Sequence, residues 1–316
     1  MMRMTVLASG SKGNSTVIAS STTRILVDAG LSCRELIKRM KAAGQDPAAL
    51  DAILITHEHQ DHVQGLAVTA RRLGVPVYWT EPTHRAWVRW LTPRKRITYA
   101  EWLEQRRAQA AAPVMEPDPE EKEAAEEALS EGNDGSQAGQ SGAAERDPSW
   151  IPAVEYFQSG NGFRIGDIAV TPFTIPHDAV DPVGFVFEAE GVRVGMATDL
   201  GYLPSNLNMH LRGCDVLMLE SNHDLDMLRD GPYPWAVKQR VMSRVGHLSN
   251  DAAAEFLAKN YDGHATYVVL AHLSESNNLP ELARMAAENA LQNRMSLLAN
   301  KVLLAAQNSP MEALEL

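Results

Sequence analysis

Short apolar runs recur along the chain, and between several of them the apolar positions repeat with the spacing of an amphipathic helix. Ser32 and Glu35 form a capping box, which predicts the start of the first helix. In the first half of the chain we expect strands at residues 4–8, 16–19, 24–27, 52–56 and 75–79, with helices at 33–43 and 63–73.

The second half repeats this pattern and predicts strands at 153–157, 168–175, 184–188, 192–197, 216–220, 267–271 and 302–305, with helices at 235–245, 251–260 and 280–292. Hairpin-like spacing dominates where a doubly wound sheet would need repeated strand-helix-strand units. We therefore expect one α/β domain over residues 1–316, built as a four-layer α/β/β/α sandwich of two facing sheets with helices outside.

The segment at 108–150 departs from this pattern. Residues 113–148 hold eleven acidic residues against Lys122 and Arg146, in a chain of net charge −11. Large apolar side chains are almost missing there, so the segment cannot bury enough surface to offset the entropy of ordering. We expect an acidic, low-complexity, disordered insertion, which is either a tolerated surface loop or an acidic mimic that competes with a polyanion.

The sign of the charge reverses just upstream of that segment. Residues 71–107 hold nine Arg or Lys against three acidic residues, with six Trp and Tyr among them. Basic side chains neutralise phosphates and aromatic faces stack on unpaired bases, so this stretch is a candidate track for single-stranded nucleic acid. The alternative is a helix that buries its tryptophans in the core while its arginines face water or pair with the acidic insertion.

Composition excludes several other classes of protein. Cys33 and Cys214 are too few and too isolated for a disulfide framework, and the chain has no C-x-x-C pair for thiolate zinc ligation. No signal-peptide core follows Met1, and no stretch approaches about 18 uninterrupted apolar residues. We expect a cytoplasmic protein that does not span a membrane, with its oligomeric state open.

The segment His57–His62, with the sequence HEHQDH, places four potential metal ligands within two turns of backbone. Because it lies between a predicted strand and a predicted helix, His57 and His59 can point one way while Asp61 and His62 face a second point a few ångströms away. Imidazoles this close repel one another when charged unless a cation joins them. We therefore predict two adjacent metal positions here, rather than a solvated polar loop with incidental histidines.

Ionisable residues also follow four other predicted strands, namely Asp28, His177, Asp199 and His272. Any one of them alone is more often a turn cap or a satisfied core residue. Four at the same structural position, beside a metal motif at the end of a fifth strand, favour a shared function. We expect all of them to converge on one edge of the sandwich.

The order of these residues resembles that of the metallo-β-lactamase-fold metallo-hydrolases. More narrowly, the chain is similar to the YycJ/WalJ-like branch, whose members are regarded as DNA exonucleases. The resemblance covers nearly all of the chain outside roughly 101–150, and its motifs are Ser9–Ser15, Pro176–Ala179, Asp181–Phe185, Ala197–Gly201, Glu220–Asp224, Gly246–Asn250 and His272–Asn278.

The resemblance implies two divalent metal ions per chain, with the ligands His57, His59 and His177 for the first ion, Asp61, His62 and His272 for the second, and Asp199 as a bridge. It also implies that Asp28 accepts a hydrogen bond from a ligand imidazole and fixes its orientation. A set of imidazoles and carboxylates suits Zn²⁺, which the histidine count favours, and Mn²⁺ is the alternative.

Two ions about 3.5–4 Å apart would activate a shared water as hydroxide for in-line attack on a phosphodiester and would stabilise the charge on the phosphate oxygens. Asp61 and Asp199 would then belong to the catalytic centre. By similarity to nuclease relatives, His247 is a candidate to contact the scissile phosphate or protonate the leaving oxygen, against a turn-capping role. Two polar loops supply candidates for substrate binding, namely Ser11, Asn14, Ser274 and Asn277.

Three functions are compatible with these residues. The expected one is an exonuclease that acts on DNA in the 5′ to 3′ direction, on single strands or 5′ ends. The second is a small-molecule hydrolase of thioesters or lactones on the same fold. The third is a non-catalytic binding protein, which would lack one or more ligands, whereas all seven are present in this sequence.

Overall fold

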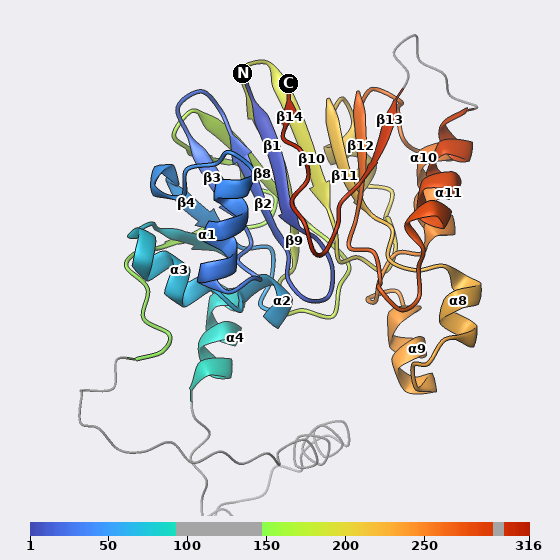
Figure 1. Cartoon of the computed structure of the whole chain (residues 1–316), viewed down its shortest axis with the longest axis horizontal. Helices are drawn as coiled ribbons and strands as arrows, with labels where there is room; N and C mark the ends of the chain where they lie inside the picture. Colours follow the sequence, from blue (N-terminus) through green and yellow to red (C-terminus); the bar gives the residue numbers. More distant parts are fainter. Residues whose placement is uncertain (93–146, 293–299) are drawn as a thin grey trace, which may run out of the picture. The chain divides into compact units, whose positions relative to one another are not determined.

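The computed structural model describes residues 1–92, 147–292 and 300–316. Met1–Leu91 and Pro148–Leu316 form one compact unit. Two seven-stranded sheets pack face to face in this unit, with helices on their outer faces (Figure 1). The predicted four-layer sandwich is therefore confirmed. The predicted insertion at 108–150 lies outside the described residues except for 147–150.

The first sheet has the order β14-β1-β2-β3-β4-β5-β6. Strands β1 to β3 and β14 pair antiparallel, whereas β3 to β6 pair parallel. Its strands are β1 (Arg3–Ala8), β2 (Ser15–Ala19), β3 (Arg24–Val27), β4 (Ala52–Leu54), β5 (Val77–Trp79), β6 (Val154–Tyr156) and β14 (Leu314–Glu315).

The second sheet has the order β13-β12-β11-β10-β9-β8-β7 and the same division into an antiparallel and a parallel half. Antiparallel pairs therefore account for only half of each sheet, and the expectation that hairpin-like connections dominate was wrong for the parallel halves. Parallel neighbours need crossover connections, which the helices provide. Its strands are β7 (Phe163–Ile165), β8 (Ile168–Thr174), β9 (Val183–Ala189), β10 (Val192–Ala197), β11 (Val216–Glu220), β12 (Tyr267–Ala271) and β13 (Lys301–Leu304).

Helices cover both outer faces. Ser32 caps α1 by accepting a hydrogen bond from Glu35 N, as the sequence predicts. The predicted helix at 63–73 divides into α2 and α3, because Gly65 N donates to Ala29 O and Asp61 O accepts from Asn14 N, which replaces the helical bond between Gly65 and Asp61. The helices are α1 (Cys33–Ala42), α2 (Gln60–Val63), α3 (Leu66–Leu73), α4 (Glu81–Leu91), α7 (Leu207–Leu211), α8 (Leu225–Asp230), α9 (Trp235–Val241), α10 (Asn250–Lys259) and α11 (Pro280–Gln292).

The central strands are buried on both faces, and β11 shows how. Val216 and Met218 belong to the core between the sheets, whereas Leu217 and Leu219 belong to the core beneath the outer helices. A strand buried on both sides reads as a continuous apolar run. The ionisable side chain of β11, Glu220, lies at the end of the strand, and the candidate functional residues likewise lie at or just after strand ends. None of the described helices has the length and apolar character needed to cross a bilayer.

Candidate metal centre

The residues that follow the strands change the direction of the chain sharply. Asp28 follows β3, Asp199 follows β10 and His272 follows β12, and their φ angles are 60°, 61° and 55°. Among the described non-glycine residues, only Glu190 shares this left-handed conformation. Such a conformation costs about 1–3 kcal/mol per residue and persists where surrounding contacts over-determine it. Three of these four strained positions therefore lie in the predicted site.

The first cluster consists of His57, His59 and His177, whose ligand atoms all lie within 4.8 Å of one another. His59 Nδ1 is 3.2 Å from His177 Nε2. The His57 side chain is fully buried, and its Nε2 has no hydrogen-bond partner among the described residues. Three imidazoles that face one point, with a buried nitrogen unsatisfied, fit a cation that accepts their lone pairs.

The second cluster consists of Asp61, His62, Asp199 and His272, again within 4.8 Å. Asp61 Oδ2 lies 3.4 Å from His62 Nε2 and 3.5 Å from His272 Nε2. Asp199 places Oδ1 3.4 Å from His272 Nε2 and Oδ2 3.5 Å from His62 Nε2. Because the rings of His57 and His62 are 4.0 Å apart between centroids, the two clusters are adjacent. All seven predicted ligands are thus brought together, as two neighbouring groups.

Hydrogen bonds on the far side of each imidazole fix its orientation. His62 Nδ1 lies 2.8 Å from Asp28 Oδ2, which places Asp28 where the resemblance implies. His177 Nδ1 donates to Val245 O at 3.1 Å. His59 is turned the other way, with its Nε2 3.2 Å from Asp178 O, and so presents Nδ1 to the cluster. Outer contacts of this kind determine which nitrogen of a ligating histidine is free.

Glu220 is a candidate functional residue that the sequence pattern did not single out. Its side chain is fully buried, and Oε1 lies 2.7 Å from His247 Nδ1 and 3.1 Å from His272 Nδ1. Its Oε2 accepts a hydrogen bond from Leu200 N at 2.8 Å. The sequence did hold a signal, because Glu220 ends the apolar strand β11 in the way that Asp199 follows β10.

His247 lies beside the second cluster, with Nδ1 3.9 Å from Asp199 Oδ1 and a side chain that is 23% exposed. Burial lowers the pKa of His247, but the Glu220 carboxylate outweighs that effect and the pKa is raised. The capping role that was the alternative for His247 is filled by Ser249, whose Oγ accepts the hydrogen bond from Ala252 N that caps α10. His247 Nδ1 instead contacts the Glu220 carboxylate at 2.7 Å.

The four candidates for substrate binding lie in different settings. Ser11 is exposed. Asn14 is buried, and its Nδ2 lies 3.0 Å from both Asp61 Oδ2 and His62 Nε2, so it contacts the second cluster itself. Asn277 is also buried and bonds Ser274 Oγ through its backbone N and its Nδ2. Of the four, Ser11 alone has an exposed side chain.

Charge in the second cluster is balanced between imidazoles and carboxylates. Burial raises the pKa of Asp61 and of Asp199, but His62 and His272 outweigh it and keep both pKa values below the usual range of a carboxyl group. Burial and the neighbouring His62 lower the pKa of His57 well below its usual value. Burial lowers the pKa of His62 and of His272, but Asp61 and Asp199 outweigh it and raise both pKa values well above the usual value. A cation bound at the second cluster would therefore displace the protons of these two imidazoles.

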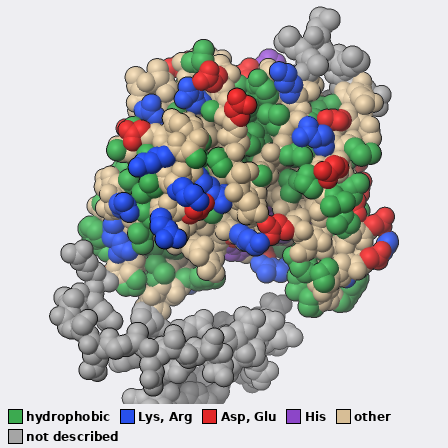
Figure 2. All heavy atoms as spheres, in the orientation of Figure 1, with side chains coloured by type: hydrophobic (Ala, Val, Ile, Leu, Met, Phe, Trp, Pro, Cys, Tyr) green, Lys and Arg blue, Asp and Glu red, His purple; other side chains and the backbone are tan. Residues whose placement is uncertain are grey.

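The basic and aromatic stretch at 71–107 is described only as far as residue 92. Trp79 and Trp87 are buried in the core of the first sheet, so they cannot stack on bases, whereas Trp90 is 66% exposed. Lys and Arg side chains gather over α1 and α3 (Figure 2). The alternative that places tryptophans in the core is confirmed for these two, and residues 93–107 lie outside the described residues.

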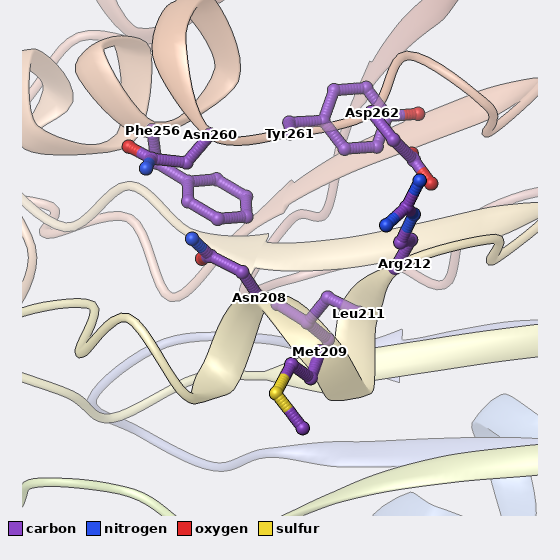
Figure 3. A pocket seen from close by; sticks show the side chains of 8 residues that line it. All are labelled: Asn208, Met209, Leu211, Arg212, Phe256, Asn260, Tyr261 and Asp262. Atoms are coloured by element: carbon purple, nitrogen blue, oxygen red, sulfur yellow. The ribbon is translucent and has the colours of Figure 1, made fainter.

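A separate cavity of about 290 Å³ lies between α7 and α10 (Figure 3). Leu211 and Phe256 form its apolar part, and they belong to the core beneath the outer helices of the second sheet. The Arg212 and Asp262 side chains approach each other at its edge (Figure 3). None of the clustered ionisable residues lines it, so the candidate metal centre and this cavity are distinct features.

Comparisons with known proteins agree with this geometry. The family model described as the metallo-beta-lactamase superfamily matches residues 8–237. Exodeoxyribonuclease YycJ of Bacillus anthracis is 31% identical over 93% of this chain and 90% of its own length. Exodeoxyribonuclease WalJ of Streptococcus pneumoniae serotype 2 is 32% identical over 92% of this chain and 88% of its own.

The fold is also found among solved structures. The metallo-beta-lactamase fold protein YhfI from Bacillus subtilis superposes with a TM-score of 0.59, at 15% identity, over 98% of this chain and 99% of that protein. At this identity the likeness bears on the architecture alone. The arrangement of two facing sheets with outer helices is therefore shared with a protein of low sequence identity.

Proposed function

The chain belongs to the metallo-beta-lactamase superfamily and, within it, to the YycJ/WalJ-like branch, and on this premise we propose that this hydrolase is a two-metal exodeoxyribonuclease. It would remove nucleotides from DNA in the 5′ to 3′ direction, acting on single strands or 5′ ends. The observation that carries the proposal is the adjacency of two imidazole and carboxylate clusters that contain unsatisfied buried ligand atoms. The names of the two curated relatives supply the reaction and the substrate.

We propose that His57, His59 and His177 hold one ion, that Asp61, His62 and His272 hold the other, and that Asp199 lies between them. The fit rests on unpartnered buried atoms, namely His57 Nε2, Asp199 Oδ2 and His272 Nε2. Imidazole and carboxylate ligands suit Zn²⁺ and also Mn²⁺. When bound, two such ions activate water and stabilise charge on phosphate oxygens.

The residues of the chain would then orient the reactants and move the proton. The Glu220 carboxylate holds His247 through Nδ1, which leaves Nε2 to contact the scissile phosphate or to protonate the leaving oxygen. Asn14 donates to Asp61 and keeps that carboxylate turned toward the second cluster. Asp28 accepts a hydrogen bond from His62 Nδ1 and fixes the orientation of that ring. The cytoplasm is the proposed location, because Cys33 and Cys214 are both free and buried.

The test is an incubation of purified protein with 5′-phosphorylated single-stranded DNA and either Zn²⁺ or Mn²⁺. We expect a ladder of shortened products. Asp199→Ala should lose nearly all activity and keep its fold, which circular dichroism would confirm. Elemental analysis of protein purified without added metal would identify the ions.

Two results would overturn the proposal. Turnover of a thioester or lactone without DNA cleavage under either metal would identify the protein as a small-molecule hydrolase. Full activity in Asp199→Ala would show that the carboxylate placed between the two clusters does not serve the reaction.

A further inference from the structure

We propose that the arginine turn, which comprises the last two residues of α9 and the loop that follows it (residues 240–247), binds the phosphate backbone of a single-stranded polynucleotide beside the metal centre through Arg240 and Arg244. The inference rests on the proposed nuclease function and adds the place where the uncleaved part of the strand lies. Both arginines are exposed, and neither belongs to the clusters that hold the ions.

Backbone contacts attach the arginine turn to the metal centre. Val245 O accepts hydrogen bonds from Asp178 N at 3.0 Å and from His177 Nδ1 at 3.1 Å. On the other side, a Cβ on Gly201 would lie 2.4 Å from the carbonyl carbon of Arg244. The loop after β10 therefore packs directly against the turn. Both loops that hold the turn also carry proposed metal ligands, so its position is fixed relative to the reaction centre.

Asp178 connects Arg240 to the first imidazole cluster. Its Oδ2 accepts a hydrogen bond from Arg240 Nε at 2.5 Å. Its Oδ1 is 3.4 Å from His177 Nε2 and 3.9 Å from His59 Nε2. The Arg240 side chain is 67% exposed, and its terminal nitrogens have no partner among the described residues. A guanidinium held through Nε presents those two nitrogens in the planar geometry that suits phosphate oxygens.

Arg244 supplies a second fixed cation. Its guanidinium carbon lies 4.3 Å from the centroid of the Tyr202 ring, and within the described part of the chain it makes no ion pair. A guanidinium that stacks on an aromatic face keeps its charge and its outward-pointing N–H groups. Tyr202 comes three residues after Asp199, so this cation is also held beside the metal centre.

A polynucleotide fits this surface better than a small substrate does. Two guanidinium groups outside the ligand clusters match a ligand that carries further negative charges beyond the scissile phosphate. Hydrophobic side chains gather over α8 and α9 (Figure 2). Trp235, the first residue of α9, is 62% exposed. An exposed indole close in sequence to the arginine turn offers a face on which an unpaired base can stack.

The test measures binding of a fluorescent, phosphorothioate-linked oligothymidylate, which resists cleavage, by anisotropy over a range of salt concentrations. We expect Arg240→Gln and Arg244→Gln each to bind about 10-fold more weakly than wild type. Each should also reduce the slope of log affinity against log salt by about 0.7. Arg240→Lys should keep the wild-type salt slope. Arg229→Gln is the matched control, because Arg229 is 63% exposed and pairs with acidic residues of α8.

The outcomes separate the two proposals. If wild type cleaves DNA but Arg240→Gln and Arg244→Gln bind the oligonucleotide as tightly as wild type and Arg229→Gln do, the arginine turn is not the binding surface. The nuclease proposal would then still stand. Weaker binding with an unchanged salt slope would overturn the inference as well, because it would mean that Arg240 only ties α9 to Asp178. If wild type neither binds nor cleaves DNA, the proposed function fails. Circular dichroism of every variant would confirm that the fold is intact.

Discussion

Asp28 and His62 form a buried pair in which Asp28 Oδ2 lies 2.8 Å from His62 Nδ1. Thr56 completes the arrangement, since its backbone N and its Oγ1 both donate to the Asp28 carboxylate at 2.9 Å. Burial raises the pKa of Asp28, although the neighbouring His62 opposes that effect. A carboxylate held on both sides in this way sets the ring orientation of His62 and increases its basicity toward a metal.

We predict that Asp28→Asn weakens binding of the ion at the second cluster by about 10- to 100-fold, because the amide keeps the shape but removes the negative charge behind His62. Isothermal titration calorimetry of the metal-free protein with Zn²⁺ would measure the affinity of both sites. Asp226→Asn is the control, because Asp226 is 77% exposed on α8. Two sites of unchanged affinity in Asp28→Asn would contradict the role given to this pair.

Glu220 leads to a separate prediction. Because one carboxylate oxygen contacts both His247 and His272, Glu220→Gln should disturb the proposed proton donor and one metal ligand together. We expect kcat to fall about 10²- to 10⁴-fold, the range for loss of a positioned acid or base, with a smaller change in KM. Steady-state cleavage of single-stranded DNA would measure both. Glu255→Gln, on the exposed surface of α10, should behave as wild type, and wild-type kcat in Glu220→Gln would refute the assignment.

Removal of metal should lower the stability of the fold. The seven clustered ligands include buried carboxylates and imidazoles whose atoms lack partners, and a ligand that binds only the folded state stabilises it by about 4 kcal/mol at 1,000 times its Kd. We expect chelation to lower the Tm and re-addition of Zn²⁺ or Mn²⁺ to restore it. The Tm of Asp199→Ala should respond much less. Equal Tm values with and without chelator would argue against resident ions.

Much of the fold could be predicted because local patterns determine it. The ten strands of the sheet centres are apolar runs, and Ser32 caps α1 where the sequence places the cap. Two short edge strands, β14 and β7, were not predicted. They span only two and three residues, too few to show an alternation of apolar and polar positions. The break between α2 and α3 depends on the hydrogen bond from Gly65 N to Ala29 O, a contact between segments that sequence spacing does not reveal.

The candidate site could also be predicted only in part. The convergence of His177, Asp199 and His272 on the histidine motif could be predicted, because each follows a strand and the strand ends meet at one edge. Glu220 was missed although it ends a strand too, because its role depends on the approach of His247 from a distant loop. The orientation of Asn14 toward Asp61 is likewise a tertiary contact, and composition alone assigned that side chain to the substrate.

Gly30 provides the sharpest test of how the loops are assembled. A Cβ at this position would lie 1.6 Å from Asp61 O and 2.6 Å from Asn14 N, so Gly30→Ala must displace the backbone that positions both residues. We expect a loss of about 1–3 kcal/mol in the free energy of unfolding, together with a fall in nuclease activity and in metal affinity at the second cluster. Urea unfolding and Zn²⁺ titration would measure the two effects.

The matched control is Gly162→Ala, because a Cβ there would meet its nearest neighbour, Val170 O, at an ordinary 3.6 Å. That variant should keep the stability and the metal affinity of wild type. If Gly30→Ala also retained both, the backbone around Asp61 could shift without cost. The close packing of the loop after β3 against α2 would then not be what holds the second cluster in place.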